Sequence, residues 1–192
     1  MLRLAIVLGL AAACFAQTRP NIAETFEASG NYEYHDARGT HFGMFLVDRD
    51  QDLAMAVENT TYKVQNTSTT ERFERLEICV GKSTDAIYTL RDDGKEVQCE
   101  HQPCVEILPQ FWGWVANAKY KGTIKIQEVT YDEWVGTCGA GIELGLAVLP
   151  DQLNTPQWFE IQLGEQRRIY HFLKFMATTP PANDFKVPPE CQ

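Results

Sequence analysis

The sequence predicts a mostly β domain of antiparallel strands. Short apolar runs recur along the chain, turn-forming clusters separate them, and helical periodicity is thin. Strands that follow one another without intervening helices pair with their sequence neighbours, which favours antiparallel sheets. About nine strands are expected, at residues 41–48, 53–59, 72–80, 86–90, 96–99, 123–129, 145–149, 157–163 and 168–176.

The turns between these runs predict hairpins. The charged cluster Arg49-Asp50-Gln51-Asp52 joins the first two runs, and we expect it to be a solvated hairpin turn. Runs 72–80 and 86–90 form the next pair, and Gly94 is free to take positive φ in a tight turn before 96–99.

The middle of the chain is less regular. In 123–129, Ile124 and Ile126 alternate with Lys125 and Gln127, as in a strand with one wet face. Residues 111–120 are compatible with either a short helix or an extended segment.

The N-terminus predicts secretion. Arg3 supplies a positive charge, Leu4 to Ala13 is apolar, and Ala16 stands before the expected cut, so residues 1–16 read as a signal peptide. Residues 17–192 then form a single domain, and a cut after Ala13 is the alternative. The apolar run is too short to span a bilayer, and no later run is long enough.

The mature chain is acidic. Loss of Arg3 leaves 16 basic against 26 acidic residues, which changes the formal charge from −9 to −10. Such a surface repels phosphate backbones, so nucleic acid is not an expected partner. Adsorption to anionic membranes is disfavoured for the same reason, whereas weak binding of divalent cations is compatible with this charge.

The cysteines predict disulfides but leave the pairing open. They are Cys14, Cys79, Cys99, Cys104, Cys138 and Cys191. A cut after Ala16 leaves five, which implies two bridges plus either a thiol for intermolecular pairing or a buried free thiol. A cut after Ala13 allows three bridges. The absence of a C-x-x-C pair and the scattered histidines disfavour zinc.

Two glycosylation sequons flank one polar segment. They begin at Asn59 and Asn66, in one polar segment rich in Thr and Ser. A glycan is bulky and faces water, so we expect a surface loop here.

No motif predicts catalysis. Asp48–Asp52 begins like a calcium-binding loop, but Leu53 and Asn59 stand where that loop needs glycine and glutamate. The glycines of Gly136–Gly141 fit a turn anchored by a disulfide better than a phosphate-binding loop. His171 lies in an apolar run, where a packed or hydrogen-bonded role is expected. The chain is therefore not expected to be an enzyme.

Aromatic side chains are the candidate ligand site. Large aromatics line apolar sites as readily as they fill cores. The candidates for a pocket wall are Trp112, Trp114, Trp134, Trp158 and Phe159.

An ordered set of elements resembles the ependymin-related family of secreted glycoproteins. The set includes Phe73-Glu74, Asp85–Tyr88 with Cys99, Pro109, Gly122 with Trp134, Phe159–Gly164, and the ending Phe185-x-x-Pro188-Pro189-x-Cys191. It covers residues 31–191 and is best after Trp158.

The resemblance implies curved antiparallel sheets like those of the bacterial lipoprotein carriers, with few short helices around an apolar pocket. It also implies glycosylation, a homodimer, a lipid or other apolar ligand, and calcium-influenced behaviour. By position, it implies a Cys99–Cys191 disulfide. Cys138 lies near the family's middle cysteine, for which only Cys14 is left as a partner, and no metal ligands are assigned.

The predicted function is therefore a secreted, extracellular glycoprotein that binds a lipid or fatty acid in an apolar pocket. The alternative is a structural or adhesive matrix glycoprotein without a ligand. A lipocalin-like carrier is the third hypothesis, although Gly30-Asn31-Tyr32 poorly replaces the Gly-x-Trp expected near the mature N-terminus of that class.

Overall fold

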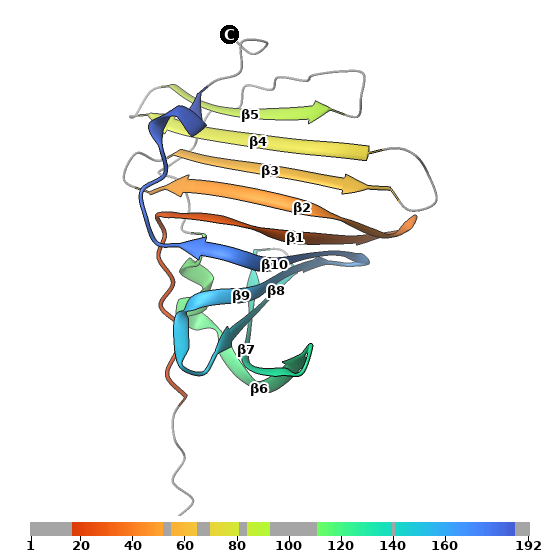
Figure 1. Ribbon diagram of the computed structural model, residues 1–192, viewed down its shortest axis with the longest axis vertical. Helices are drawn as coiled ribbons and strands as arrows, with labels where there is room; N and C mark the ends of the chain where they lie inside the picture. Colours follow the sequence, from red (N-terminus) through yellow and green to blue (C-terminus); the bar gives the residue numbers. More distant parts are fainter. Residues whose placement is uncertain are drawn as a thin grey trace, which may run out of the picture.

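The computed structural model describes residues 17–51, 55–64, 70–80, 84–92, 111–139 and 141–186. Ten antiparallel strands in this part of the chain form one curved sheet, in the order β5-β4-β3-β2-β1-β10-β9-β8-β7-β6 (Figure 1). The strands are β1 Phe26–Asp36, β2 Gly39–Asp50, β3 Met55–Lys63, β4 Thr70–Val80, β5 Thr84–Asp92, β6 Lys119–Ile126, β7 Val129–Cys138, β8 Ile142–Leu149, β9 Gln152–Leu163 and β10 Gln166–Met176.

The predicted fold class is confirmed: the chain is mostly β and its sheet is antiparallel and curved. The helices among the described residues are two short 3₁₀ turns, η1 Gly113–Asn117 and η2 Ala182–Phe185. The undecided segment 111–120 thus divides into η1 and the first residues of β6.

One strand pairing joins the first strand of the chain to the last. Every other neighbouring pair of strands is consecutive in sequence, but β1 pairs with β10 over Glu27–His35 and Arg167–Met176. This pairing makes one continuous sheet from two meanders, β1–β5 and β6–β10. In Figure 1 the strands β1 to β5 lie in one layer with β10, and β6 to β9 curl away from it.

The hairpin predicted around Arg49–Asp52 is present, but Arg49 and Asp50 are not solvated. Strand β2 extends to Asp50, and the side chains of Asp48, Arg49 and Asp50 are buried. Arg49 lies 3.5 Å from the Glu24 carboxylate, so part of this burial is compensated by an ion pair.

Two other boundaries differ from the prediction. Asn59 lies inside β3, opposite Leu46 of β2, rather than in a loop, because the pairing of β3 with β2 continues through the sequon to Lys63. Residues 123–129 are not one strand, since Gln127 and Glu128 take φ values of 46° and 70° in a tight turn between β6 and β7.

The core lies on the concave face of the sheet. It joins β1 and β2 to β7–β10 through buried side chains such as Phe26, Phe45 and Leu146. The segment before η1 packs into this face, where Trp112 contacts Phe159 at a ring-centroid distance of 5.2 Å. Its backbone is held by Glu24, whose carboxylate accepts hydrogen bonds from the amides of Phe111 and Trp112 at 2.7 and 2.8 Å.

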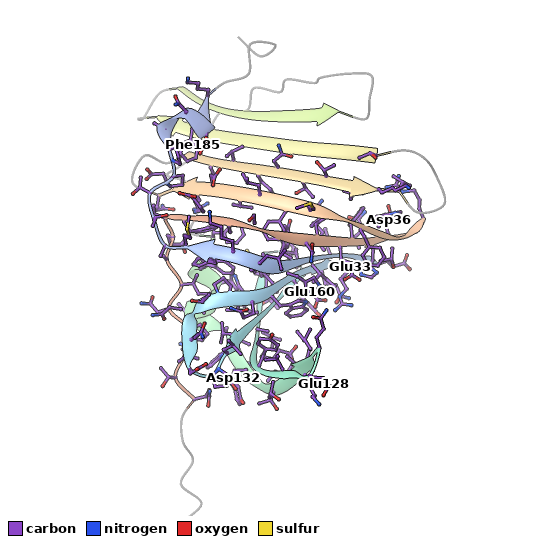
Figure 2. All side chains as sticks on the ribbon, in the orientation of Figure 1. Glu33, Asp36, Glu128, Asp132, Glu160 and Phe185 are labelled. Carbon is purple, nitrogen blue, oxygen red and sulfur yellow. The ribbon has the colours of Figure 1, made fainter. Side chains whose placement is uncertain are left out.

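The opposite face is covered at two places. The curl of β6 and β7 brings Ile124, Ile126 and Tyr131 onto a smaller apolar cluster of Ala147, Trp158 and Ile169. Residues 177–186, the C-terminal strap, run past the strand ends to η2, which packs on β3 (Figure 1). Figure 2 shows Phe185 of the strap, in η2, which contacts β3. The Phe185 side chain is buried.

Several expectations lie outside the described residues: the signal peptide, Asn66, the strand at 96–99, and the Cys99–Cys191 disulfide. Cys138 is described, at the end of β7, and it is a free and exposed thiol. The turn predicted at Gly136–Gly141 is present between β7 and β8, with Gly139 and Gly141 at positive φ. Because Cys138 is not in a disulfide, the glycines and the hairpin pairing hold the turn.

Candidate functional site

A cavity of about 490 Å³ lies along η1 and strands β6 to β9. We call it the tryptophan cavity. Its walls are formed by Trp114, Asn117, Lys119, Lys121, Glu133, Val135, Gly136, Thr137, Glu143, Leu144, Gly145, Trp158, Glu160 and Gln162. Cavities that hold small ligands in proteins have volumes of about 300–1,000 Å³, so this one is large enough for a small molecule or part of a lipid chain.

Strand lengths explain where the cavity opens. Strand β6 begins at Lys119, opposite Val135, whereas β7 continues to Cys138. Among the described strands, residues 136–138 of β7 therefore pair only with β8. The chain enters β6 here from η1, and η1 places Trp114 against Gly136 of β7.

Trp158 packs against a glycine of the neighbouring strand. Gly145 pairs with Glu160 of β9, two residues from Trp158. A Cβ atom on Gly145 would lie 3.1 and 3.3 Å from the ring atoms Cζ3 and Cη2 of Trp158, closer than ordinary van der Waals contact. The missing side chain thus lets the indole rest on the backbone of β8.

Trp114 uses a second glycine in the same way. A Cβ atom on Gly136 would lie 2.7 Å from Cε3 of Trp114. The indole also stacks on Phe159, at a centroid distance of 6.2 Å and an interplanar angle of 27°. Two glycines of adjacent strands therefore make room for the two tryptophans that line the cavity, Gly136 for Trp114 on the concave face and Gly145 for Trp158 on the opposite face.

Charged side chains complete the walls. The Lys121 ammonium lies 2.9 Å from the Glu133 carboxylate, and Glu160 is bound by the Arg167 guanidinium. The hydrogen bond from Arg167 to Glu160 raises the pKa of the guanidinium, so Arg167 is charged at any physiological pH. Figure 2 shows Glu160 on β9, in the curled half of the sheet.

Two charges on these walls have no ion-pair partner among the described side chains. They are Lys119 on β6 and Glu143 on β8, and both are exposed. The cavity therefore combines indole rings and aliphatic groups with free charges of both signs. Such a surface fits an amphipathic molecule, whose apolar part contacts the tryptophans and whose polar part stays near the charges.

The aromatic residues proposed from the sequence fall into two groups. Trp114 and Trp158 line the cavity, and Trp158, at 6% exposed, also belongs to the smaller apolar cluster. Trp112, Trp134 and Phe159 are each 3% exposed and belong to the main core. The sequence did not separate the two groups, and Trp112 and Trp114 lie in different environments at the start of η1.

Sequence reasoning missed the two glycines and the charged walls. Gly145 carried a usable signal, since glycine inside an apolar strand marks close approach of another group. Lys119, Lys121, Glu143 and Glu160 resemble ordinary surface charge, and only the curl of β6–β9 brings them together.

The described residues contain no group of three or more His, Cys, Asp or Glu side chains arranged to hold a metal ion. The calcium-influenced behaviour therefore stays a prediction without an assigned site. Within the same part of the chain, no helix has the length and apolar character needed to cross a membrane.

Sequence comparison does not assign the chain: no protein-family model matches it, and no curated protein matches it. Structural comparison does find similar folds. An uncharacterized conserved protein from Thermus thermophilus aligns with a TM-score of 0.51 at 10% identity, over 88% of this chain and 89% of that one. At this identity the similarity concerns the fold alone.

Two further solved structures align less closely. One is a complex of Pseudomonas aeruginosa MucA/MucB, with a TM-score of 0.37, 13% identity, and coverage of 88% of this chain and 58% of that chain. The other is MucB in complex with MucA(peri), with a TM-score of 0.32, 14% identity, and coverage of 87% and 56%.

Proposed function

We propose that this chain is a secreted binding protein that holds a lipid or fatty acid, or another amphipathic molecule of similar size, in the tryptophan cavity. The observation that carries the proposal is the pair of indoles, Trp114 and Trp158, laid on Gly136 and Gly145 around a cavity of about 490 Å³. The fold itself, a curved antiparallel sheet, is compatible with ligand binding.

Burial of an apolar chain supplies the affinity. Each methylene moved from water to an apolar wall contributes about 0.8 kcal/mol, so eight methylenes contribute roughly 6 kcal/mol before the entropic cost of binding. Lys119 and Glu143 do not need to be desolvated, because both are exposed. They interact with the polar end of the ligand where it meets water.

Other parts of the proposal rest on the sequence. These are secretion, glycosylation at Asn59 and Asn66, the kinship with ependymin-related glycoproteins, the homodimer, the calcium response and the non-enzymatic role. The matrix-protein alternative differs in one measurable respect, since it requires no ligand in the cavity.

The first test is native mass spectrometry of protein secreted from a eukaryotic cell line. A co-purifying adduct of lipid mass is the expected result. The second test is titration of lipid-free protein with dibrominated stearic acid, because bromine quenches only the indoles that it contacts.

Matched double variants assign the quenching to the cavity. Trp114→Phe with Trp158→Phe should abolish most of the quenching. Trp112→Phe with Trp134→Phe should increase the quenched fraction, because the core indoles no longer contribute emission. Protein that carries no adduct and is quenched by neither fatty acid nor brominated phospholipid would refute the proposal, and a ligand-free dimer would favour the matrix role.

A further inference from the structure

Strand β2 carries three large apolar side chains on the outer face of the sheet. Phe42, Met44 and Leu46 are 64%, 63% and 44% exposed and alternate with inward residues such as Phe45, which is buried. We call these three residues the β2 stripe. Isolated apolar residues are normal on a surface, but three in one row form a patch that promotes association.

The C-terminal strap does not cover the β2 stripe. It covers the next row of the same face, where Asp48 of β2 and Val57 of β3 lie opposite each other and are each 7% exposed. Asp184 of the strap lies close enough to Asp48 to raise its pKa. The strap therefore covers Asp48 but does not reach Leu46, the next residue of β2 on the same face.

The first glycosylation sequon lies directly beside the stripe. In the pairing of β2 with β3, Leu46 stands opposite Asn59 and Met44 opposite Thr61. Residues opposite one another on antiparallel strands share a face, with Cβ atoms about 5 Å apart. The acceptor Asn59 and the hydroxyl residue Thr61 of Asn59-Thr60-Thr61 are thus both on the outer face, next to the exposed apolar side chains.

Small polar residues flank the stripe on its other side. In the pairing of β1 with β2, Ser29 stands opposite Leu46 and Asn31 opposite Met44. These short side chains leave the outer surface of the β2 stripe accessible to solvent. A sugar attached at Asn59 would meet Leu46 first and Met44 next, since diagonal neighbours on a sheet lie about 7–8 Å apart.

We propose that Asn59 carries an N-linked glycan whose first sugars lie on the β2 stripe and shield it from water and from other molecules. The C–H faces of N-acetylglucosamine rings cover apolar side chains, while their hydroxyl groups face solvent. This inference rests on the secretion and glycosylation included in the proposed function, but not on ligand binding. The β2 stripe and Asn59 lie on β2 and β3, which β1 and β10 separate from the strands β6–β9 that line the tryptophan cavity.

The attachment is a glycosyl transfer in the secretory pathway. The Asn59 amide nitrogen forms a bond to the anomeric carbon of the first N-acetylglucosamine, which a lipid-linked oligosaccharide diphosphate donates. The bond between that carbon and the diphosphate oxygen breaks, the diphosphate leaves with the bonding electrons, and a base of the transferase takes one amide proton. The transfer acts on the nascent chain, so the strand conformation of β3 in the folded protein does not block it.

A matched pair of variants tests the proposal in full-length protein secreted from eukaryotic cells. Thr61→Ala removes the sequon and leaves Asn59 in place, whereas Thr61→Ser keeps the sequon. Peptide mass spectrometry should find a glycan on Asn59 in the wild type and in T61S but not in T61A. Emission of the dye ANS should rise about twofold or more in T61A relative to T61S, because three large apolar side chains become accessible.

Two further variants separate shielding from other effects. Met44→Thr with Leu46→Thr in the T61A background should return the dye signal and any self-association to the T61S level. Asn66→Gln should leave both unchanged. An unmodified Asn59, equal dye binding by T61A and T61S, or the same rise in N66Q would each overturn the proposal.

Discussion

Asp48 is expected to destabilise the folded protein at neutral pH. Its side chain lies under the C-terminal strap and is 7% exposed. Burial is the main cause that raises its pKa to about 6, the carboxylates of Asp184 and Glu27 raise it further, and Lys174 acts in the opposite direction. The substitution Asp48→Asn keeps the size of the side chain and removes its charge.

The magnitude follows from the pKa difference. The ordinary pKa is 3.8 and the folded value is about 6, so ionisation costs the folded state about 3 kcal/mol, at about 1.4 kcal/mol per pH unit. Because the folded pKa is the higher one, stability falls as pH rises from about 4 to 6 and is constant above that range. Relaxation and water reduce the cost in practice, so we expect Asp48→Asn to stabilise the protein at pH 7.5 by about 2 kcal/mol.

The assay is urea denaturation followed by circular dichroism at pH 4, 5, 6 and 7.5. The gain in the free energy of unfolding should be largest at pH 7.5 and close to zero at pH 4. The control is Asp151→Asn, at an exposed position between β8 and β9, which should change stability little at any pH. A difference between Asp48→Asn and wild type that is independent of pH, or a loss of stability at pH 7.5, would refute the reasoning.

Three further substitutions test the packing by urea denaturation. Gly136→Ala should cost about 1–3 kcal/mol, because its Cβ would lie 2.7 Å from the Trp114 ring and displace η1; an unchanged free energy would contradict that contact. Leu146→Ala should cost about 2–5 kcal/mol, since this side chain is fully buried in the core. Tyr170→Phe should cost about 1–3 kcal/mol, because it removes the hydroxyl that donates a 2.8 Å hydrogen bond to the Glu58 carboxylate. An unchanged free energy of unfolding in Tyr170→Phe would mean that water hydrogen-bonds to Glu58 in place of the hydroxyl.

The strands were predictable where apolar alternation was strong. The hairpins β2–β3 and β4–β5 and the strands β8 to β10 all appear near their expected positions. Strand β1 was missed because Ser29-Gly30-Asn31 has the composition of a turn. Its strand conformation depends on pairing with β2 on one side and β10 on the other, which no local pattern reveals.

The roles of individual side chains were less predictable. Asp48 and Asp50 have the composition of a solvated turn, yet both are buried. Among the aromatic candidates, burial of Trp112 and exposure of Trp158 to a cavity depend on which face of the sheet each reaches. Sequence spacing gives the alternation of faces along one strand, but it does not say what covers either face.

The sequence by itself determined a mostly β chain, because alternation and turn chemistry are local properties of neighbouring residues. It also determined where the sequons and the aromatic side chains stand along the chain. Only the tertiary structure decided that β1 joins β10, that the sheet curls to form the tryptophan cavity, and that Asn59 lies beside the β2 stripe. The first two features depend on contacts between residues far apart in sequence, and the third depends on the register of the β2–β3 hairpin, which local composition does not specify.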